Sequence, residues 1–214
     1  MDEAALREAW NSGKRVFPPK PLVFPPKPDE AGQRWFLRTE INPERERDLV
    51  FIGINPSTAT RFTADGDGAD PTTRAILDFF PLNDDGSPQD WRSMTIVNLL
   101  PIIGQKKDLP RWSRGASEGR NMILQTIPTT RQVLETVLPS AACVHLMWGR
   151  RKGSGFGWKP TVLDKLAPTL LSLAEGKQVQ AYLSPSTGDP YHPAYGWWRR
   201  GEFCGDARGL LMSK

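Results

Sequence analysis

The stretch Leu49-Val50-Phe51-Ile52-Gly53-Ile54-Asn55-Pro56-Ser57-Thr58 decides the fold. Its apolar part is too short for a globular helix and breaks at Gly53, so it predicts a buried parallel strand that ends in a polar turn. In open α/β sheets, ligands bind at the carboxyl ends of the strands. The turn Asn55-Pro56-Ser57 is therefore the first candidate for a functional loop.

Three later apolar runs end in the same way, at residues 94–97, 142–148 and 179–183. They lead into Asn98, into Gly149-Arg150-Arg151 and into Ser184-Pro185-Ser186. Helices are expected over residues 71–80, 117–126, 129–138 and 160–173, with prolines 128 and 168 at breaks or kinks. This alternation predicts an α/β fold with a four-stranded, mostly parallel sheet that is covered on both faces. The four strand ends would converge on one crevice, and residues 34–39 would form a further strand at the sheet edge.

The N-terminal region carries a direct repeat, Val16-Phe17-Pro18-Pro19-Lys20-Pro21 followed by Val23-Phe24-Pro25-Pro26-Lys27-Pro28. Proline at this density favours an extended polyproline segment. We therefore expect residues 1–33 to form a short helix near residues 3–12 and a proline-rich arm, and residues 34–214 to form a single α/β domain.

Composition narrows the class of protein. Of the 214 residues, 38% are hydrophobic and 24% charged, and no apolar stretch is long enough to span a bilayer. The N-terminus lacks a signal peptide, so we expect a cytoplasmic monomer without membrane contact. Cys143 and Cys204 are the only cysteines, which argues against a structural disulfide. The chain has no paired-cysteine zinc spacing, phosphate loop or G-x-S-x-G motif, and we expect no metal and no cofactor.

Two polar side chains are the candidates for chemistry. The amide of Asn55 can orient a water or read a polar ring edge, or it can simply stabilise a turn. His192 lies among turn residues after the last apolar run and can polarise an oxygen on a leaving group, or it is an ordinary surface histidine. His145, inside the third apolar run, is expected to be a core residue.

Basic residues gather after two of the strand ends, in a chain with a formal charge of +4 and a pI near 9.2. Arg150, Arg151 and Lys152 follow the third run, and Arg199 and Arg200 follow two tryptophans. Such groups can bind phosphates while neighbouring aromatic rings stack on bases. The alternative is a solvated rim with tryptophans that cover the core.

Several motifs in order resemble the bacterial and phage family known as domain of unknown function 1643. They are Asn55-Pro56-Ser57-Thr58-Ala59, Asp70-Pro71-Thr72-Thr73-Arg74, Val97-Asn98-Leu99, Trp148-Gly149 and His192-Pro193-Ala194-Tyr195. The resemblance covers roughly residues 34–200, and the family name implies no activity.

The same layout is similar to the uracil-DNA glycosylase superfamily. Gly53-Ile54-Asn55-Pro56 resembles a motif whose Asn positions the attacking water, and His192-Pro193 resembles a motif that engages the flipped base. The resemblance implies a three-layer α/β/α sandwich around a four-stranded parallel sheet. Ser57 stands where a glycine is usual, and Ala194-Tyr195-Gly196 follows His192-Pro193 in place of the usual residues. Ser184-Pro185-Ser186 therefore remains a second candidate for the last motif.

Together these features predict a DNA glycosylase-like hydrolase that acts in base excision on a nucleobase in DNA or in a nucleotide. Asn55 and His192 would be catalytic, and the five basic residues at the strand ends would bind phosphates. The substrate would contact Gly53, Ile54, Pro56, Ser57, Asp70, Asn98, Trp148, Ser186 and Tyr195. Two alternatives stay open: a non-catalytic module that binds nucleic acid or nucleotides in phage or mobile-element biology, and an enzyme acting on an unrelated metabolite.

Overall fold

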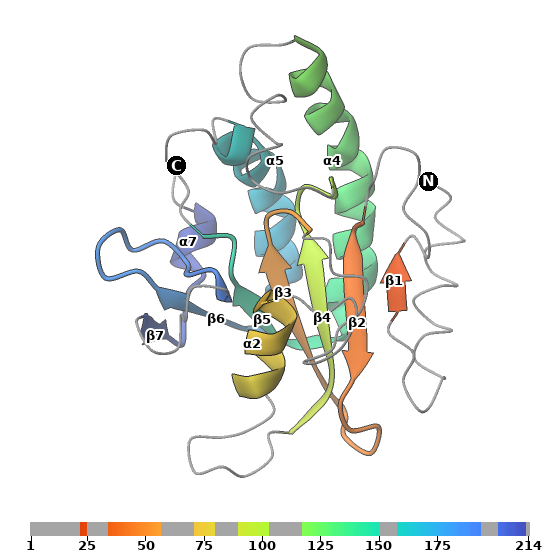
Figure 1. Cartoon of the computed structure of the whole chain (residues 1–214), viewed down its shortest axis with the longest axis vertical. Helices are drawn as coiled ribbons and strands as arrows, with labels where there is room; N and C mark the ends of the chain where they lie inside the picture. The colour runs from red at the N-terminus through yellow and green to blue at the C-terminus, as the bar shows by residue number, and fades with distance from the viewer. Residues whose placement is uncertain are drawn as a thin grey trace.

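The computed structural model describes residues 22–24, 34–56, 71–79, 90–102, 117–149, 158–193 and 201–212. Within these residues, seven strands form one sheet in the order β1-β2-β4-β3-β5-β6-β7 (Figure 1). The strands are β1 (Leu22–Phe24), β2 (Phe36–Glu40), β3 (Arg47–Gly53), β4 (Trp91–Asn98), β5 (Ala141–Leu146), β6 (Gln178–Leu183) and β7 (Glu202–Cys204). The helices are α2 (Pro71–Phe79), α4 (Ser117–Val137), α5 (Trp158–Leu173) and α7 (Gly209–Met212), with a 3₁₀ turn η1 (Leu138–Ser140).

The centre of the sheet is parallel. Strands β4, β3, β5 and β6 lie side by side, and each neighbouring pair runs in the same direction. These are the four strands expected from the apolar runs. The expectation of a four-stranded, mostly parallel sheet is nevertheless wrong, because β1, β2 and β7 add antiparallel pairs at the two flanks of the described sheet. Strand β1 consists of Leu22 and the first two residues of the second proline-rich copy. It pairs with β2, the strand expected at residues 34–39.

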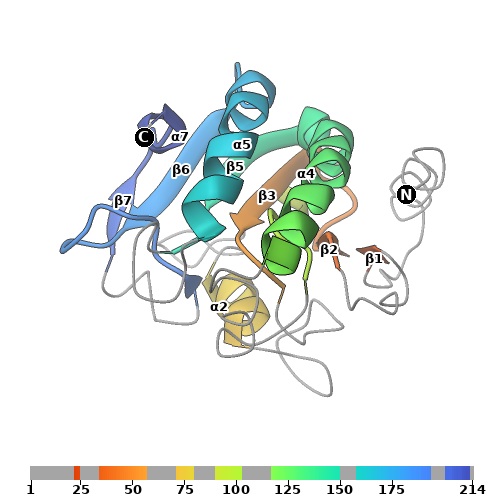
Figure 2. The same cartoon turned by 90° about the horizontal axis from the view of Figure 1, so that it is seen from above.

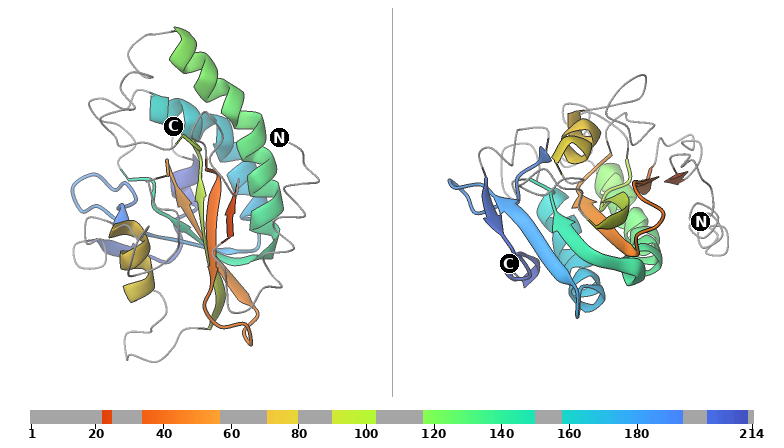
Figure 3. Two further views of the ribbon diagram at one scale, coloured as in Figure 1. Left: turned by 45° about the vertical axis from the view of Figure 1, so that its right-hand side comes forward. Right: turned by 90° about the horizontal axis from the view of Figure 1, so that it is seen from below.

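Helices cover both faces of the sheet. Val50 and Ile52 of β3 pack in a core cluster with residues of α4, α5 and α7. Leu49 and Phe51, on the opposite face, pack with Ile76 of α2. Figures 2 and 3 show α4 and α5 on one side of the sheet and α2 on the other. The alternating side chains of the strands therefore enter two separate apolar layers, as expected for a parallel sheet with both faces buried.

Helix α4 corrects the expectation of two helices separated at Pro128. It runs without interruption from Ser117 to Val137 and contains Pro128, which is exposed. Buried residues at helical spacing continue across this point, from Ile123 and Ile127 to Val133 and Val137. Proline removes one backbone hydrogen bond, here on the solvent side, and packing of the apolar stripe offsets that loss. Helix α5 likewise continues through Pro168. None of the described helices is both long and apolar enough to cross a bilayer.

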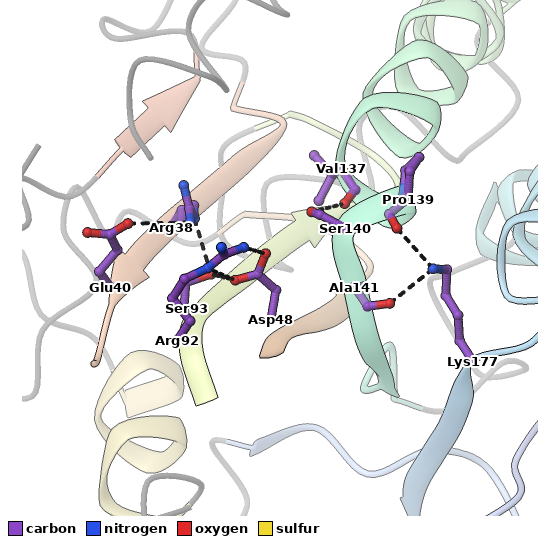
Figure 4. Close-up of polar contacts among 10 residues, drawn as sticks. All are labelled: Arg38, Glu40, Asp48, Arg92, Ser93, Val137, Pro139, Ser140, Ala141 and Lys177. Carbon is purple, nitrogen blue, oxygen red and sulfur yellow. Dashed lines mark hydrogen bonds and ion pairs between the residues drawn. The ribbon is translucent and has the colours of Figure 1, made fainter. Parts of the chain in front are cut away.

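A buried polar cluster lies at the amino ends of β3 and β4 (Figure 4). The carboxylate of Asp48, only 1% exposed, accepts hydrogen bonds from Arg92 Nε at 3.0 Å, from Arg92 Nη2 and from Ser93 Oγ at 2.6 Å. Arg38 Nε, also buried, donates to Ser93 Oγ at 3.2 Å. The register of β4 shifts by one residue opposite Arg47 and Asp48, so the consecutive side chains of Arg92 and Ser93 both reach one carboxylate.

The pKa values of the two arginines of this cluster are shifted in opposite directions. The hydrogen bonds to Asp48 raise the pKa of the Arg92 guanidinium above its ordinary value. Burial lowers the pKa of Arg38, an effect that the charges of Asp48 and Glu40 oppose. The charges of Asp48 and Glu40 therefore offset part of the cost of burying the Arg38 guanidinium. At the same end of the sheet, Lys177 Nζ donates to the carbonyls of Pro139 at 3.2 Å and Ala141 at 3.0 Å, which fixes the entry into β5 (Figure 4).

Candidate functional site

The carboxyl ends of the four central strands lie at one edge of the sheet. Gly53 at the end of β3 is in register with Asn98 at the end of β4, and Ile52 is in register with Leu146 at the end of β5. Leu146 is in turn in register with Ala181 of β6. The expected convergence of the four strand ends is thus confirmed, and it brings the loops that follow β3, β4, β5 and β6 to the same edge.

The loop from Gly53 to Pro56 is held against the end of β4. The carbonyls of Gly53 and Ile54 accept hydrogen bonds from the backbone amides of Leu99 at 3.1 Å and Leu100 at 2.7 Å. Ile54 and Pro56 are buried, whereas Asn55 between them is half-buried. The Asn55 amide donates to the carbonyl of Pro56 at 3.3 Å. The backbone of the loop is therefore fixed, and Asn55 is its only side chain with access to solvent among the described residues 53–56.

Gly53 and Asn98 meet beneath this loop. A Cβ at Gly53 would lie 3.3 Å from Met147 Cε and 3.5 Å from Asn98 Oδ1, so a side chain at this position would press on both neighbours. Asn98 is only 2% exposed, and within the described structure its Nδ2 has no hydrogen-bond partner. A buried amide that donates no hydrogen bond is costly, by about 1–3 kcal/mol. Asn98 Nδ2 is therefore placed to donate a hydrogen bond to an acceptor on a ligand.

The segment after β6 returns to the end of β5. Residues 184–189 form a loop closed by a hydrogen bond from Ser184 N to Asp189 O at 2.9 Å. Pro190 then pairs with Leu183, and the Tyr191 amide donates to Tyr182 O at 2.6 Å. Because β5 ends at Leu146, the segment after residue 189 can pair with β6 beyond the end of β5. His192 therefore lies at the same edge of the sheet as the strand ends.

His192 and Lys159 both lie close to Gly149. The Cβ of His192 and the Nζ of Lys159 are each 3.7 Å from the point where a Cβ of Gly149 would stand. Gly149 has a φ of 72°, which glycine adopts without strain. His192 is half-buried, and Lys159, the second residue of α5, is only 5% exposed. The segment after β6 and the start of α5 thus come together near Gly149, three residues beyond the end of β5.

The two candidates for the last glycosylase-like motif, Ser184-Pro185-Ser186 and His192-Pro193, lie in different surroundings. Ser186 lies in the exposed loop, where its hydroxyl is 3.1 Å from that of Ser184, whereas His192 lies close to Gly149, three residues beyond the end of β5. Trp148, expected to contact substrate, is 3% exposed and packs in the core between the sheet and α4 and α5. The remaining predicted positions, Ser57, Asp70, Arg150, Arg151, Lys152, Tyr195, Arg199 and Arg200, lie outside the described residues.

Two potentially reactive groups of β5 are confined to the core. Cys143 is a free thiol whose pKa burial raises to about 12, so it stays protonated at neutral pH. His145 is fully buried next to the rings of Phe51 and Tyr182, and desolvation lowers its pKa to about 3. The expectation that His145 is a core residue is confirmed. Neither group can serve the chemistry of the strand ends.

The low pKa of His145 predicts a specific pH dependence of stability. The unfolded chain binds a proton at His145 below about pH 6.5, whereas the folded protein does not until about pH 3. Stability from this residue is therefore present above pH 6.5 and is lost as the pH falls, by roughly 1.4 kcal/mol per unit. Between pH 7 and pH 5 we expect a loss of roughly 2 kcal/mol in urea unfolding, which His145→Leu abolishes. If the free energy of unfolding of His145→Leu still depends on pH, the variant His192→Gln tests whether the other histidine is the cause. A pH dependence in His145→Leu equal to that of the wild type would contradict the prediction.

Lys159 is the site residue that sequence reasoning missed. It immediately precedes Pro160, where a helix was expected to begin. The one feature of the sequence that could have indicated a functional role is its positive charge, between a loop at a strand end and the start of a helix. Nothing in that pattern indicates burial, because a lysine at a helix start is usually solvated.

One comparison with known proteins gives a match. A family model described as protein of unknown function (DUF1643) matches residues 34–194. This range begins before β2 and ends just after His192, so it includes every strand end of the site. No curated protein and no solved structure matches the chain.

Proposed function

We propose that this chain, which belongs to the family described as protein of unknown function (DUF1643), hydrolyses the N-glycosidic bond of a nucleobase in DNA or in a nucleotide. The proposal extends the likeness to uracil-DNA glycosylases from the motifs to the fold. The parallel core β4-β3-β5-β6 with helices on both faces supports that likeness, and the antiparallel strands at its flanks are departures from the four-stranded pattern.

The observation that carries the proposal is the buried amide of Asn98. Its Nδ2 has no hydrogen-bond partner within the described residues, and it lies beside Gly53 at the edge where ligands bind in parallel sheets. An unsatisfied buried donor in a native structure requires an explanation, and a ligand oxygen supplies one. Uracil, thymine, cytosine and guanine carry ring carbonyls that accept hydrogen bonds from amides in the plane of the base. Asn98 is thus suited to read the edge of a base that enters from solvent.

The roles of the other residues follow from this placement. Asn55, the solvent-accessible side chain of the rigid loop after β3, aligns a water toward the sugar C1′. The C1′ to nitrogen bond breaks as the water oxygen bonds to C1′, the base departs with the bonding electrons, and the proton that the water loses passes through solvent to the base anion. His192 donates a hydrogen bond to the departing base and stabilises its negative charge. Arg150, Arg151, Lys152, Arg199 and Arg200, which lie outside the described residues, are assigned to the phosphates.

The test is a panel of duplex and single-stranded oligonucleotides that carry different mismatched, deaminated and alkylated bases. After incubation with the full chain, alkali cleaves any abasic site, and a gel shift on the same samples measures binding. We expect at least one modified base to be released and the corresponding unmodified duplex to remain intact. Binding without release across the whole panel would argue against hydrolysis.

A second function is favoured by one contact. The Asn55 amide already donates to the carbonyl of Pro56, as a turn residue would, and the described loop 53–56 holds no carboxylate to act as a base. A non-catalytic module that binds nucleic acid or nucleotides through the same edge is consistent with this contact. It predicts salt-sensitive binding without release, because phosphate contacts displace counterions from the nucleic acid.

A further inference from the structure

Phe203 is an exposed aromatic side chain on β7, at one flank of the described sheet (Figure 1). It is 57% exposed, and Met212 is the only other large apolar side chain of the described residues that is exposed. Phe203 pairs with Tyr182 of β6, and the two rings are 5.4 Å apart with an angle of 56° between their planes. Contact with Tyr182 therefore holds the Phe203 ring against the sheet, while more than half of the residue stays open to solvent.

Phe203 lies on the same face and at the same edge of the sheet as the candidate site. The residues in register across β3, β5, β6 and β7 are Ile52, Leu146, Ala181 and Cys204. The next row toward the carboxyl ends of the parallel strands is Gly53, Met147, Tyr182 and Phe203. Met147 and Tyr182 pack in the apolar cluster on the α2 face, and Asn98 approaches Gly53 beside Met147. The row therefore leads from Asn98 across the sheet to Phe203.

The length of this row defines what can reach both of its ends. Strands β3, β5, β6 and β7 are successive neighbours, so Gly53 and Phe203 are separated by three strand spacings, or about 14 Å. A stacked nucleic acid strand advances about 3.4 Å per nucleotide, and an extended strand advances more. A strand with one base at Asn98 would therefore bring a base roughly two to four nucleotides away to Phe203.

Positive charge adjoins Phe203 in the sequence. Arg199 and Arg200 precede β7 and lie outside the described residues, but the covalent chain allows the Cα of Arg200 to lie at most about 11 Å from that of Phe203. Glu202 and Cys204, the neighbours of Phe203 in β7, point to the opposite face because side chains alternate along a strand. Proteins bind single strands with aromatic rings that stack on bases and cations that hold the phosphates.

We propose that Phe203 stacks on a base of single-stranded nucleic acid that flanks the base at Asn98. The platform accepts any base, because every base has a π face, whereas Asn98 reads the edge of one. The identification of the ligand as nucleic acid rests on the proposed function. A second copy of this chain is the competing occupant. Within the described residues, a three-residue strand with one exposed ring offers far less than the roughly 800 Å² per partner of a stable interface.

Single-stranded oligothymidylate of about eight nucleotides is the probe, because it has no base-paired structure and thymine has ring carbonyls for Asn98. Binding is measured at low salt from the fluorescence anisotropy of a 5′ label. Phe203→Ala should weaken binding at least about fivefold, because it removes the stacking of one base. Phe203→Trp should bind at least as tightly as the wild type, since tryptophan offers a larger ring face. Met212→Ala removes the other exposed apolar side chain and, as the matched control, should leave the affinity unchanged.

Thymidine 5′-monophosphate, titrated by calorimetry, separates a flanking subsite from a distorted site. It can occupy the position at Asn98 without reaching Phe203, so Phe203→Ala should bind it as the wild type does. An equal loss of affinity for the mononucleotide and the oligomer would overturn the proposal. Wild-type affinity of Phe203→Ala for the oligomer, or no oligomer binding by the wild type, would also overturn it. The oligomer result decides even if the mononucleotide binds too weakly to measure.

Two further measurements distinguish this inference from its neighbours. Sedimentation that shows a wild-type dimer and a Phe203→Ala monomer would assign Phe203 to a contact between copies and overturn the proposal. Weaker oligomer binding by Phe203→Ala, together with no base release by the wild type, supports the stacking platform and counts against the hydrolase. Base release from a free nucleotide by a chain that binds no oligomer supports the hydrolase and overturns the platform.

Discussion

Replacement of Asp48 by alanine is expected to lower the free energy of unfolding by about 3–5 kcal/mol. Asp48 is the acceptor for Arg92 and Ser93, and Arg38 is linked to it through the Ser93 hydroxyl. Without the carboxylate, the buried guanidinium of Arg38 loses the favourable charge of Asp48, while its ion pair to Glu40 at 3.6 Å remains. A buried charge that loses part of its compensation costs more than one lost hydrogen bond. The loss should appear in urea unfolding at neutral pH.

Two further variants locate the cause of this loss. Asp206→Ala removes an exposed carboxylate that pairs with Arg208 and should cause no measurable change. Asp48→Leu combined with Arg38→Met removes the carboxylate and the buried cation together, and it should recover part of the stability lost in Asp48→Leu alone. A double variant no more stable than Asp48→Leu would show that the cost lies in packing. Base release should survive in Asp48→Ala below its unfolding temperature, since Asp48 and Gly53 are about 16 Å apart along β3.

The four parallel strands could be predicted because each one is an apolar run buried on both faces. Such a run can be recognised from its own residues, without knowledge of the neighbouring strands, as the sequence from Leu49 to Gly53 illustrates. The flanking strands β1 and β7 have three residues each, which is too short for any periodicity to appear. They exist because β2 and β6 offer them a free edge for hydrogen bonds. That information lies in the tertiary structure and not in the segments themselves.

The helices illustrate a similar limit. A proline predicts a helix boundary from a local rule, and Pro128 breaks that rule because the buried stripe of α4 continues on both sides of it. The local cost of one missing hydrogen bond is small compared with the burial of several apolar side chains against the sheet. A sequence-based expectation that weighs the proline alone must therefore divide the helix.

The candidate site was partly predictable for the same reason as the sheet. The loop of Asn55 and the position of Asn98 follow from the strand ends, because parallel strands bring their carboxyl ends to one edge. The position of His192 close to Gly149 depends on the returning segment at Pro190, and the burial of Trp148 and Lys159 depends on how α5 packs. A tryptophan next to a strand-end glycine and a lysine before a proline look alike in sequence whether they face solvent or the core.

Replacement of Asn55 by alanine is expected to reduce base release at least about 100-fold. In the proposed mechanism its amide fixes the water relative to C1′, and misplacement of a reacting group by about 1 Å can cost a factor on the order of 100. The fold should tolerate the change, because the lost hydrogen bond to Pro56 O is worth about 1 kcal/mol. Single-turnover release from the best oligonucleotide of the panel is the measurement. The gel-shift Kd of Asn55→Ala should stay within about threefold of the wild type, since positioning of water contributes to the transition state more than to binding.

The substitution Asn55→Asp separates positioning from a purely structural role. Aspartate keeps the shape of the side chain and provides a stronger acceptor for the water protons, so release should stay within about tenfold of the wild type or exceed it. Asn42→Ala is the matched control, because Asn42 is a turn asparagine whose Oδ1 accepts a hydrogen bond from the Glu44 amide at the opposite end of the sheet. If Asn55→Ala releases base at the wild-type rate, Asn55 only shapes its turn. Loss of release in Asn55→Ala, retention in Asn55→Asp and no effect of Asn42→Ala would favour a side chain that acts on the water, because the aspartate carboxylate cannot donate the hydrogen bond to Pro56 O that Asn55 makes in its turn.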